Sequence, residues 1–165
     1  MSTLAVALTL DLKSTLIPSS PYTGQTVADL NNGSTGARWT NGTGSAQCDR
    51  IYKKSGTLAA SATDTLNLLA AGSLTDALGQ AIDLDELKVV MVKCLTGSIK
   101  FVRAASNGAA LFTAAGEGIN LAAGQSVAVD LGAGGLSLST NASLSITDTA
   151  GGSGSTYELV LAGAQ

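Results

Sequence analysis

Hydrophobic and polar residues alternate in short runs along most of the chain, and this alternation is typical of half-buried β-strands. The runs are rich in Leu, Val, Ile and Thr, and stretches of Gly, Asn and Ser separate them. Apolar repeats with the helical spacing of about 3.6 residues are hard to find. We therefore expect strands within residues 3–12, 50–54, 63–69, 87–95, 98–104, 109–113, 126–131, 136–139, 143–147 and 156–161.

Residues 87–95 differ from the other runs because they are apolar at both odd and even positions. Such a run is typical of a strand in the centre of a sheet. Thr96-Gly97 provides a tight turn, so we expect residues 98–104 to pair with 87–95 as a hairpin. Helix is expected to be scarce, at most a short turn at Leu84–Leu87. The pattern as a whole predicts an all-β fold, an antiparallel two-sheet sandwich of jelly-roll or Greek-key type.

Residues 13–47 lose this alternation. Turn-forming residues recur there, as in Pro18-Ser-Ser-Pro-Tyr-Thr-Gly24 and Asn31-Asn-Gly-Ser-Thr-Gly36. We expect an extended loop or arm, because a loop of this length in a compact domain is normally functional or a linker. The segment contains Tyr22 and Trp39, the only tryptophan. Trp39 either covers one end of the core or anchors a partner subunit.

Composition narrows the classes of function. The 165 residues suit one sandwich domain that spans residues 1–165. Hydrophobic residues make up 45% and charged residues 13%, which excludes a disordered chain. The formal net charge is −3, so no basic excess is available for nucleic acid. The sequence has no histidine, which removes Ser–His and Cys–His nucleophile pairs and histidine zinc sites. We expect a non-enzymatic protein without a small-molecule substrate.

Two sequence features resemble ligand-binding motifs, one for a dinucleotide and one for calcium, but each lacks residues that the motif requires. Gly132-x-Gly134 follows an expected strand, but a serine stands where the dinucleotide motif needs its third glycine, and no helix pattern follows. The acidic group Asp83, Asp85 and Glu86, with Asp76 upstream, lacks the glycine and the spacing of a calcium loop. We therefore expect neither a cofactor nor a metal ion.

Basic residues gather in the middle third of the chain. They are interpreted as solvated sheet faces and edge protection, or as a contact with an acidic protein surface. We take Arg50 and Lys53 from this group, together with Trp39 and Tyr22, as candidate interface residues. The group comprises Arg50, Lys53, Lys54, Lys88, Lys93, Lys100 and Arg103.

The first residues alternate between apolar and polar and carry no early Lys or Arg, so we expect a strand there and no secretion signal. The longest aliphatic run, Val89–Val92, is far shorter than the roughly 20 residues of a membrane helix. We expect a soluble protein made in the cytoplasm, without a membrane contact. Cys48 and Cys94 are too few for a disulfide framework, and whether they pair is left open. Cys94 is expected to pack as a small hydrophobe.

Several segments, taken in order, resemble small structural proteins of tailed bacteriophages. The resemblance covers mostly residues 41–103 and the last expected strand, and it carries no catalytic motif. The segments are Asn41-Gly-Thr-Gly-Ser-Ala-Gln-Cys-Asp-Arg-Ile-Tyr52, Gly56-Thr-Leu-Ala-Ala-Ser-Ala-Thr-Asp-Thr-Leu-Asn-Leu68, Gly72-Ser-Leu-Thr-Asp-Ala-Leu-Gly-Gln-Ala-Ile82, Leu87-Lys-Val-Val-Met-Val-Lys93 and Thr156-Tyr-Glu-Leu-Val-Leu-Ala-Gly-Ala164.

The resemblance implies a β-sandwich that is bound to a phage particle. The function that it implies is a capsid cement or decoration protein, which stabilises the shell by contacts between subunits. Its partners would be the major capsid protein and copies of itself, as a trimer or dimer. It would be made in the cytoplasm of the host bacterium and located in the virion. The alternatives are a tail, fibre or baseplate component, or a glycan-binding module for host attachment.

Overall fold

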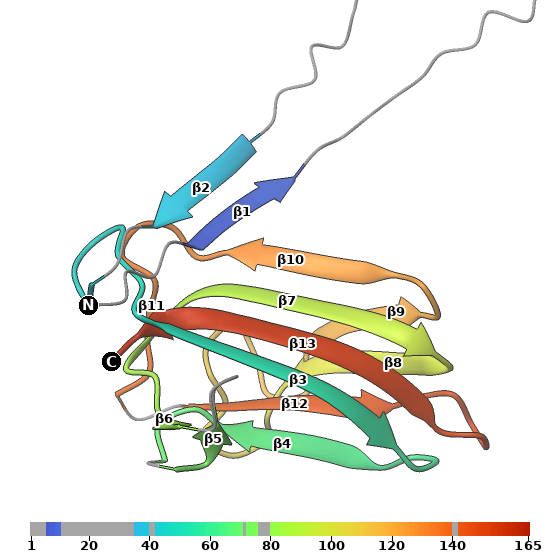
Figure 1. The fold of residues 1–165 in the computed structure, drawn as a ribbon. Helices are drawn as coiled ribbons and strands as arrows, with labels where there is room; N and C mark the ends of the chain where they lie inside the picture. Colours follow the sequence, from blue (N-terminus) through green and yellow to red (C-terminus); the bar gives the residue numbers. More distant parts are fainter. Residues whose placement is uncertain (1–5, 11–34, 40–41, 71, 76–79, 140–141) are drawn as a thin grey trace, which may run out of the picture.

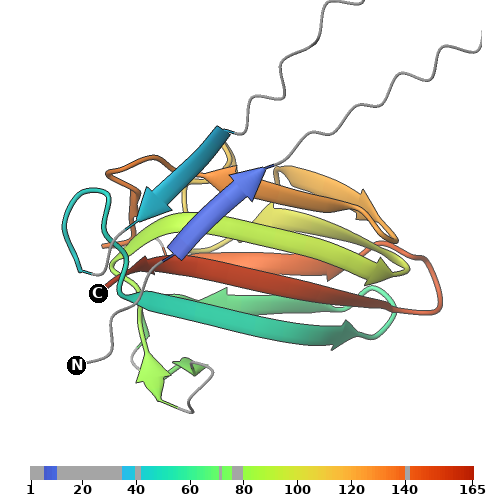
Figure 2. The ribbon, with the colours of Figure 1, turned by 45° about the horizontal axis from the view of Figure 1, so that its top comes forward.

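The computed structural model describes residues 6–10, 35–39, 42–70, 72–75, 80–139 and 142–165 (Figure 1). Within these ranges the chain forms strands and turns, and no helix occurs. The main body consists of two antiparallel sheets that face each other across a hydrophobic core (Figures 1 and 2). The predicted all-β fold is confirmed, and the short helical turn expected at Leu84–Leu87 is wrong.

The first sheet, called the β7 sheet here, has the strand order β10-β7-β13-β3. Its central strands are the longest of the described chain, β7 (Glu86–Thr96) and β13 (Ser155–Ala164). The outer strands are β3 (Arg50–Leu58) and β10 (Ser126–Asp130). The short β11 (Leu136–Ser137) continues the pairing of β10 along the same side of β7.

The second sheet, called the β8 sheet here, has the strand order β4-β12-β8-β9. Its strands are β4 (Thr63–Asn67), β12 (Ser143–Asp148), β8 (Ser98–Arg103) and β9 (Gly118–Ala122). A small separate pair, β5 (Leu74–Thr75) and β6 (Ala81–Ile82), lies on the path from β4 to β7. Both main sheets are antiparallel throughout, as expected.

The connections between strands identify the topology. Among the eight main strands, six connections leave one sheet and enter the other: β3 to β4, β4 to β7, β7 to β8, β9 to β10, β10 to β12 and β12 to β13. The order β10-β7-β13-β3 thereby faces β9-β8-β12-β4, with each strand opposite its neighbour in sequence. Eight antiparallel strands wound in this way form a jelly roll, which confirms the predicted sandwich of jelly-roll type.

The expected hairpin between residues 87–95 and 98–104 is wrong, although the turn itself is correct. Gly97 adopts a positive φ of 73°, and the chain passes there from β7 to β8 in the other sheet. A Cβ atom at this position would lie 2.4 Å from Ser155 Oγ and 2.6 Å from the carbonyl oxygen of Gly154. The start of β13 closes over the turn, so the turn becomes a corner of the sandwich.

Residues 87–95 are confirmed as a central strand, because β7 has β10 on one side and β13 on the other. The inward side chains Val90, Val92 and Cys94 are fully buried. Phe101 on β8 and Tyr157 on β13 are also fully buried and fill the space between the sheets. These inward residues form the centre of the hydrophobic core.

Two strand predictions failed for local reasons. Residues 109–113 form turns and bends in place of a strand, and their contact with β12 is limited to its first residue, where the backbone N–H of Ala109 donates to the carbonyl oxygen of Ser143 at 2.9 Å. The missed strand β9 contains Gly118, which sequence patterns favour in turns. A Cβ atom at Gly118 would lie 2.0 Å from the carbonyl oxygen of Phe101, so the glycine lets β9 approach β8 closely.

The start of the chain forms its own two-stranded sheet, with β1 (Val6–Leu10) antiparallel to β2 (Thr35–Trp39). The strand expected within residues 3–12 is therefore present. The expected loop at 13–47 is corrected at Thr35–Trp39, which finds a pairing partner at the start of the chain. Residues 13–34 and 40–41 lie outside the described residues, so the arm itself, like the single-domain organisation, remains a prediction.

Candidate interaction surface

The outer face of the β7 sheet is the part of the described structure that is best suited to bind another protein. Because side chains alternate along a strand, the buried residues of β7 leave Met91, Lys93 and Leu95 on the opposite face. Met91 is 37% exposed and Leu95 is 39% exposed. They are the only large hydrophobic side chains classed as exposed among the described residues.

The pairing register places these residues in rows across the sheet. Met91 lies beside Val160 on β13, and Lys93 lies beside Glu158 on the same strand. Extending the register to β3 and β10 gives two rows of outward-facing residues, each of them exposed or half-buried. The candidate surface consists of the Met91 row (Lys53, Val160, Met91, Ala128), the Lys93 row (Ser55, Glu158, Lys93, Ser126) and Leu95.

The charges of the candidate surface have no ionic partner within the described chain. Lys53, Lys93 and Glu158 form no ion pair there, although Lys93 and Glu158 are direct cross-strand neighbours. Apolar area and unpaired charges therefore lie together on one sheet face. This combination is typical of a surface that another protein covers.

One end of the same sheet face is already covered by the segment 42–49. Cys48 is buried there against Val89 and Ala162, with Ile51 packed beside them. The backbone N–H of Ala46 donates a hydrogen bond to the carbonyl oxygen of Ala133 at 2.9 Å, which ties this segment to the loop after β10. The candidate surface begins where this cover ends.

The two cysteines are free and buried, and they occupy opposite faces of the β7 sheet. Cys94 packs in the main core, as expected for a small hydrophobe, whereas Cys48 belongs to the outer cluster. Burial raises the pKa of both thiols, which favours the protonated form. Their placement on the two sides of the sheet precludes a disulfide between them in this fold.

The outer face of the β8 sheet contrasts with the candidate surface, because its polar groups bind one another. The Thr63 and Thr147 hydroxyls are 2.9 Å apart, and the Thr65 and Ser145 hydroxyls are also 2.9 Å apart. These pairs join neighbouring strands β4 and β12. One hydroxyl pair of the same kind, Thr96 and Thr156 at 2.7 Å, occurs on the outer face of the β7 sheet.

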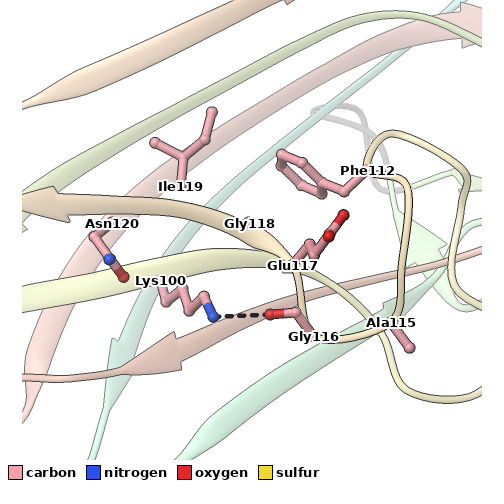
Figure 3. A pocket seen from close by; sticks show the side chains of 8 residues that line it. All are labelled: Lys100, Phe112, Ala115, Gly116, Glu117, Gly118, Ile119 and Asn120. Atoms are coloured by element: carbon pink, nitrogen blue, oxygen red, sulfur yellow. Dashed lines mark hydrogen bonds between the residues drawn. The ribbon is translucent and has the colours of Figure 1, made fainter.

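A hollow of about 720 Å³ lies beside strands β8 and β9 (Figure 3). Its charged groups are used by the surrounding loop. Lys100 Nζ donates to the carbonyl oxygen of Gly116 at 2.8 Å, and the backbone N–H of Ala114 donates to Glu117 Oε2 at 2.8 Å. Phe112, the aromatic residue of the hollow, packs edge-on against Phe101. A glycan site requires an aromatic face that is open to the sugar, and Phe112 is committed to the core instead.

A partly buried polar contact joins the two sheets at their β3 and β4 edges. Lys54 Nζ lies 2.5 Å from Asp64 Oδ2, and the Tyr157 hydroxyl donates a hydrogen bond to the same oxygen. Partial burial acts to raise the pKa of Asp64, but the hydrogen bonds from Lys54 and Tyr157 outweigh it, so this pKa lies below its usual value. Burial, and then the hydrogen bond to Asp64, raise the pKa of Tyr157.

Lys88 corrects the interpretation of the basic group as solvated, because its side chain is fully buried. The register shift between Ala162 and Gly163 marks a β-bulge, and Lys88 is the residue of β7 that this bulge leaves without a partner. Its ammonium lies 2.5 Å from Glu86 Oε2. It also donates to the carbonyl oxygens of Ala133 and Gly134, at 3.2 and 3.0 Å. The glycine-rich loop after β10 therefore encloses a lysine.

The four residues proposed from the sequence as interface residues have different positions. Lys53 is exposed in the Met91 row of the candidate surface. Arg50 lies at the start of β3, where it contacts Asp49 Oδ2 at 2.9 Å and Gln165 Oε1. Trp39 ends β2, and Tyr22 lies outside the described residues.

Sequence reasoning missed Met91, Leu95, Val160 and Glu158 as surface residues, whereas Lys93 belonged to the basic group interpreted as solvated or as a protein contact. The sequence did contain an indication of this surface, because residues 87–95 are apolar at both odd and even positions. That pattern was interpreted as burial on both faces of the sheet. The described structure buries one face and leaves Met91 and Leu95 on the other.

Comparison with known proteins gives little further identification. No family model matches the chain, and no curated protein matches it. A chain from the disulfide-linked pili of Bacillus endospore appendages is similar over 75% of this chain and 96% of its own length. The sequence identity is 15% and the TM-score is 0.34, too low for function to be compared.

Metal-binding clusters and membrane-spanning helices are absent from the described residues. No group of three or more His, Cys, Asp or Glu residues is arranged there to hold a metal ion. That part of the chain also contains no helix with the length and apolar character needed to cross a membrane.

Proposed function

We propose that this chain is a non-enzymatic structural protein of a phage particle, a capsid cement or decoration protein that stabilises the shell by contacts between subunits. The observation that carries the proposal is the candidate surface. A rigid jelly roll presents exposed Met91 and Leu95, with unpaired charges beside them, on one sheet face. Jelly rolls recur in viral capsid proteins, and exposed apolar area marks protein contacts.

The way in which the chain uses its buried polar groups supports a structural role. Asp64 holds Lys54 and Tyr157 together across the sheets, and Lys88 holds the loop after β10. Asp148 is buried and accepts hydrogen bonds from Ser155 and from the backbone of Ser61. These contacts fix strands and turns, which is what a protein that acts by shape requires.

The sequence resemblance to tailed-phage structural proteins supports the location. We place the protein in the virion, made in the host cytoplasm, with the major capsid protein and copies of itself as partners. A cement protein binds at many equivalent positions, so modest contacts add up over the lattice. Rigid attachment at each position ties neighbouring shell subunits together.

The test is quantitative peptide mass spectrometry on purified particles of the phage that encodes the chain, scaled to the major capsid subunit. We expect hundreds of copies per particle, and particles without the protein should lose integrity at lower temperature and on chelation. A few copies would indicate a tail, fibre or baseplate component and overturn the shell assignment. Absence from the particle would remove the structural role in the virion.

A further inference from the structure

We propose that the segment 42–49 is a displaceable cover, which opens while the sandwich stays folded and so lengthens the candidate surface by one row of residues. The hidden row contains Ile51, Ala162 and Val89. The inference rests on the proposed function for its biological setting, because it names what regulates the size of the surface that carries that function.

The hidden row is the most apolar row of this sheet face. The pairing register places Ile51 beside Ala162, Ala162 beside Val89, and Val89 beside Asp130. Cys48 packs on the three apolar residues, whereas Asp130 at the β10 end is exposed. The hidden row adjoins the Met91 row directly, because side chains on one face are two residues apart along a strand. Opening of the cover would therefore join this apolar row to exposed Met91.

The size of the uncovered surface explains why a further row would matter. Three rows across four strands measure roughly 20 by 20 Å, or about 400 Å². A standard interface buries roughly 800 Å² on each partner. The uncovered rows alone therefore provide a weak contact, and a fourth row adds about a third to their area.

The cover binds to a site that stays in place when the cover leaves. The backbone N–H of Ala46 donates to the carbonyl oxygen of Ala133 at 2.9 Å. The same oxygen accepts a hydrogen bond from the buried Lys88 ammonium at 3.2 Å, so the sandwich itself holds the loop after β10. At the other end of the cover, the N–H of Asp49 donates to the carbonyl oxygen of Gly163 at 3.1 Å. Asp49 thereby anchors the cover to β13.

The tip of the cover, residues 43–46, has the features of a segment with low local stability. These residues are exposed, and Figures 1 and 2 show their loop at the end of the sheet, next to the start of β3. Ala46 adopts a positive φ of 56°, which costs free energy in a residue with a Cβ atom.

The cover also carries hydrogen bonds of its own. The backbone N–H of Gln47 donates to the carbonyl oxygen of Gly44 at 3.0 Å, and the N–H of Gly44 donates to Gln47 Oε1 at 2.8 Å. These bonds do not depend on the sandwich, so they persist when the cover moves. A segment with few buried side chains and internal hydrogen bonds can detach as a unit.

The two free cysteines report on the cover and on the core separately. Cys48 lies beneath the cover in the outer cluster, and Cys94 lies in the main core. Burial raises the pKa of both thiols, and both are inaccessible to a reagent in the closed state. Opening of the cover exposes Cys48 alone, whereas exposure of Cys94 requires the sandwich to unfold.

The test is alkylation of the full chain with iodoacetamide in buffer, with both thiols followed by peptide mass spectrometry. We expect Cys48 to react about tenfold faster than Cys94 or more, because local opening costs less free energy than global unfolding. Low concentrations of urea should leave the rate at Cys48 nearly unchanged and raise the rate at Cys94, since the effect of urea scales with the surface exposed.

Substitutions at Ala46 should move the rate at Cys48 in both directions. Ala46→Pro removes the N–H that binds Ala133 and cannot adopt the positive φ. Cys48 should then react about tenfold faster, with the rate at Cys94 unchanged. Ala46→Gly accepts the positive φ without strain and should slow the reaction of Cys48 by about fivefold. Melting temperatures of all variants should be measured in parallel.

Ala60→Pro is the matched control. Ala60 is exposed at the second position of the turn in which the N–H of Ala62 donates to the carbonyl oxygen of Ala59 at 3.0 Å. Proline is favoured at this position of a turn, so both cysteines should react as in the unmodified chain.

Three results would overturn the inference. They are equal rates at Cys48 and Cys94 in the unmodified chain, a Cys48 rate that rises with urea as steeply as that of Cys94, and a Cys48 rate that Ala46→Pro does not change. The proposed function fails separately. A displaceable cover on a chain that is absent from particles removes the virion role alone, whereas a fixed cover on a chain found at high copy number removes the regulation alone.

Discussion

The two outer faces of the sandwich are built by the same alternation of side chains, yet they differ in how their polar groups are satisfied. On the β8 sheet, threonine and serine hydroxyls pair across strands at 2.9 Å. On the β7 sheet one such pair occurs as well, between Thr96 and Thr156 at 2.7 Å. Lys93 and Glu158, however, form no ion pair within the described chain and lie near exposed Met91. Polar groups that already bond one another have little to gain from a second protein. Charges without an ion-pair partner and exposed apolar area can be stabilised by contact with one.

The largest expected effect is a difference in stability between substitutions at two adjacent residues of β7, one that faces the core and one that faces outward. Val90 is fully buried and Met91 is 37% exposed. Val90→Asp should prevent folding, because it places an unpaired charge in the core at a cost of several kcal/mol. Met91→Asp should fold with nearly unchanged stability. Denaturant titration of both variants checks this, and a soluble, cooperatively melting Val90→Asp chain would show that the core is misplaced.

A second prediction concerns the packing of Tyr157 against β3. Its ring lies over Gly56, where a Cβ atom would be 2.3 Å from ring atoms. Gly56→Ala should cost about 1–3 kcal/mol of unfolding free energy through overpacking. Gly134→Ala is the matched control, because no atom lies within 4 Å of a Cβ there and its φ is not positive. Equal melting temperatures for the two variants would contradict the close packing.

The third prediction uses the pH dependence of the contact at Asp64. Because the pKa of Asp64 is lowered in the folded state, its carboxylate adds stability above its ordinary pKa of 3.8. That stability should be lost as the pH falls through the lowered value. Asp64→Asn should destabilise the fold at neutral pH by about 1–3 kcal/mol, since the charged acceptor of Lys54 and Tyr157 is gone.

The variant should also show a flatter loss of stability between about pH 4 and pH 2 than the unmodified chain. Denaturant midpoints across this pH range measure the effect. Asp130→Asn, an exposed carboxylate on β10, serves as the control and should keep the acid loss. An Asp64→Asn chain with the same acid profile as the unmodified chain would contradict a stabilising carboxylate at this position.

The smallest expected effect comes from replacing threonine by valine on each of the two outer faces and comparing the changes in stability. Thr65→Val on the β8 sheet leaves the buried Ser145 hydroxyl without its partner and should cost about 1 kcal/mol. Thr57→Val on the outer face of the β7 sheet should change stability by less than about 0.5 kcal/mol, because its side chain is exposed. A larger loss at Thr57 would reverse the proposed difference between the faces.

Much of the fold could be predicted from the sequence, because alternation reports which side of a strand is buried. The ranges 63–69, 126–131 and 143–147 each match a strand to within two residues at either end, and 50–54 and 156–161 lie inside the longer strands β3 and β13. β9 was missed because Gly118 has no side chain to contribute to the pattern. A glycine is needed at position 118 because β9 lies very close to β8 there, and that contact involves residues distant in sequence.

The candidate surface could be predicted less well, and the reasons are physical. An apolar residue on β7 looks the same in the sequence whether a neighbouring layer covers it or solvent reaches it. Lys88 shows the converse, because a lysine in a strand predicts exposure until a bulge turns it beneath a loop. Whether a side chain is buried or exposed depends on the residues that other strands and loops place beside it. The order of residues in the sequence does not show these neighbours.

The central place of β13 in the β7 sheet has a consequence for synthesis. The ribosome makes β3 and β7 long before residues 155–164, yet these two strands join only through β13. The sheet cannot close until those residues emerge, so the domain folds late and through contacts between distant segments. Chains that stop earlier leave two open strand edges and should be removed by proteases. Only a chain that extends through residue 164 fills the place between β3 and β7.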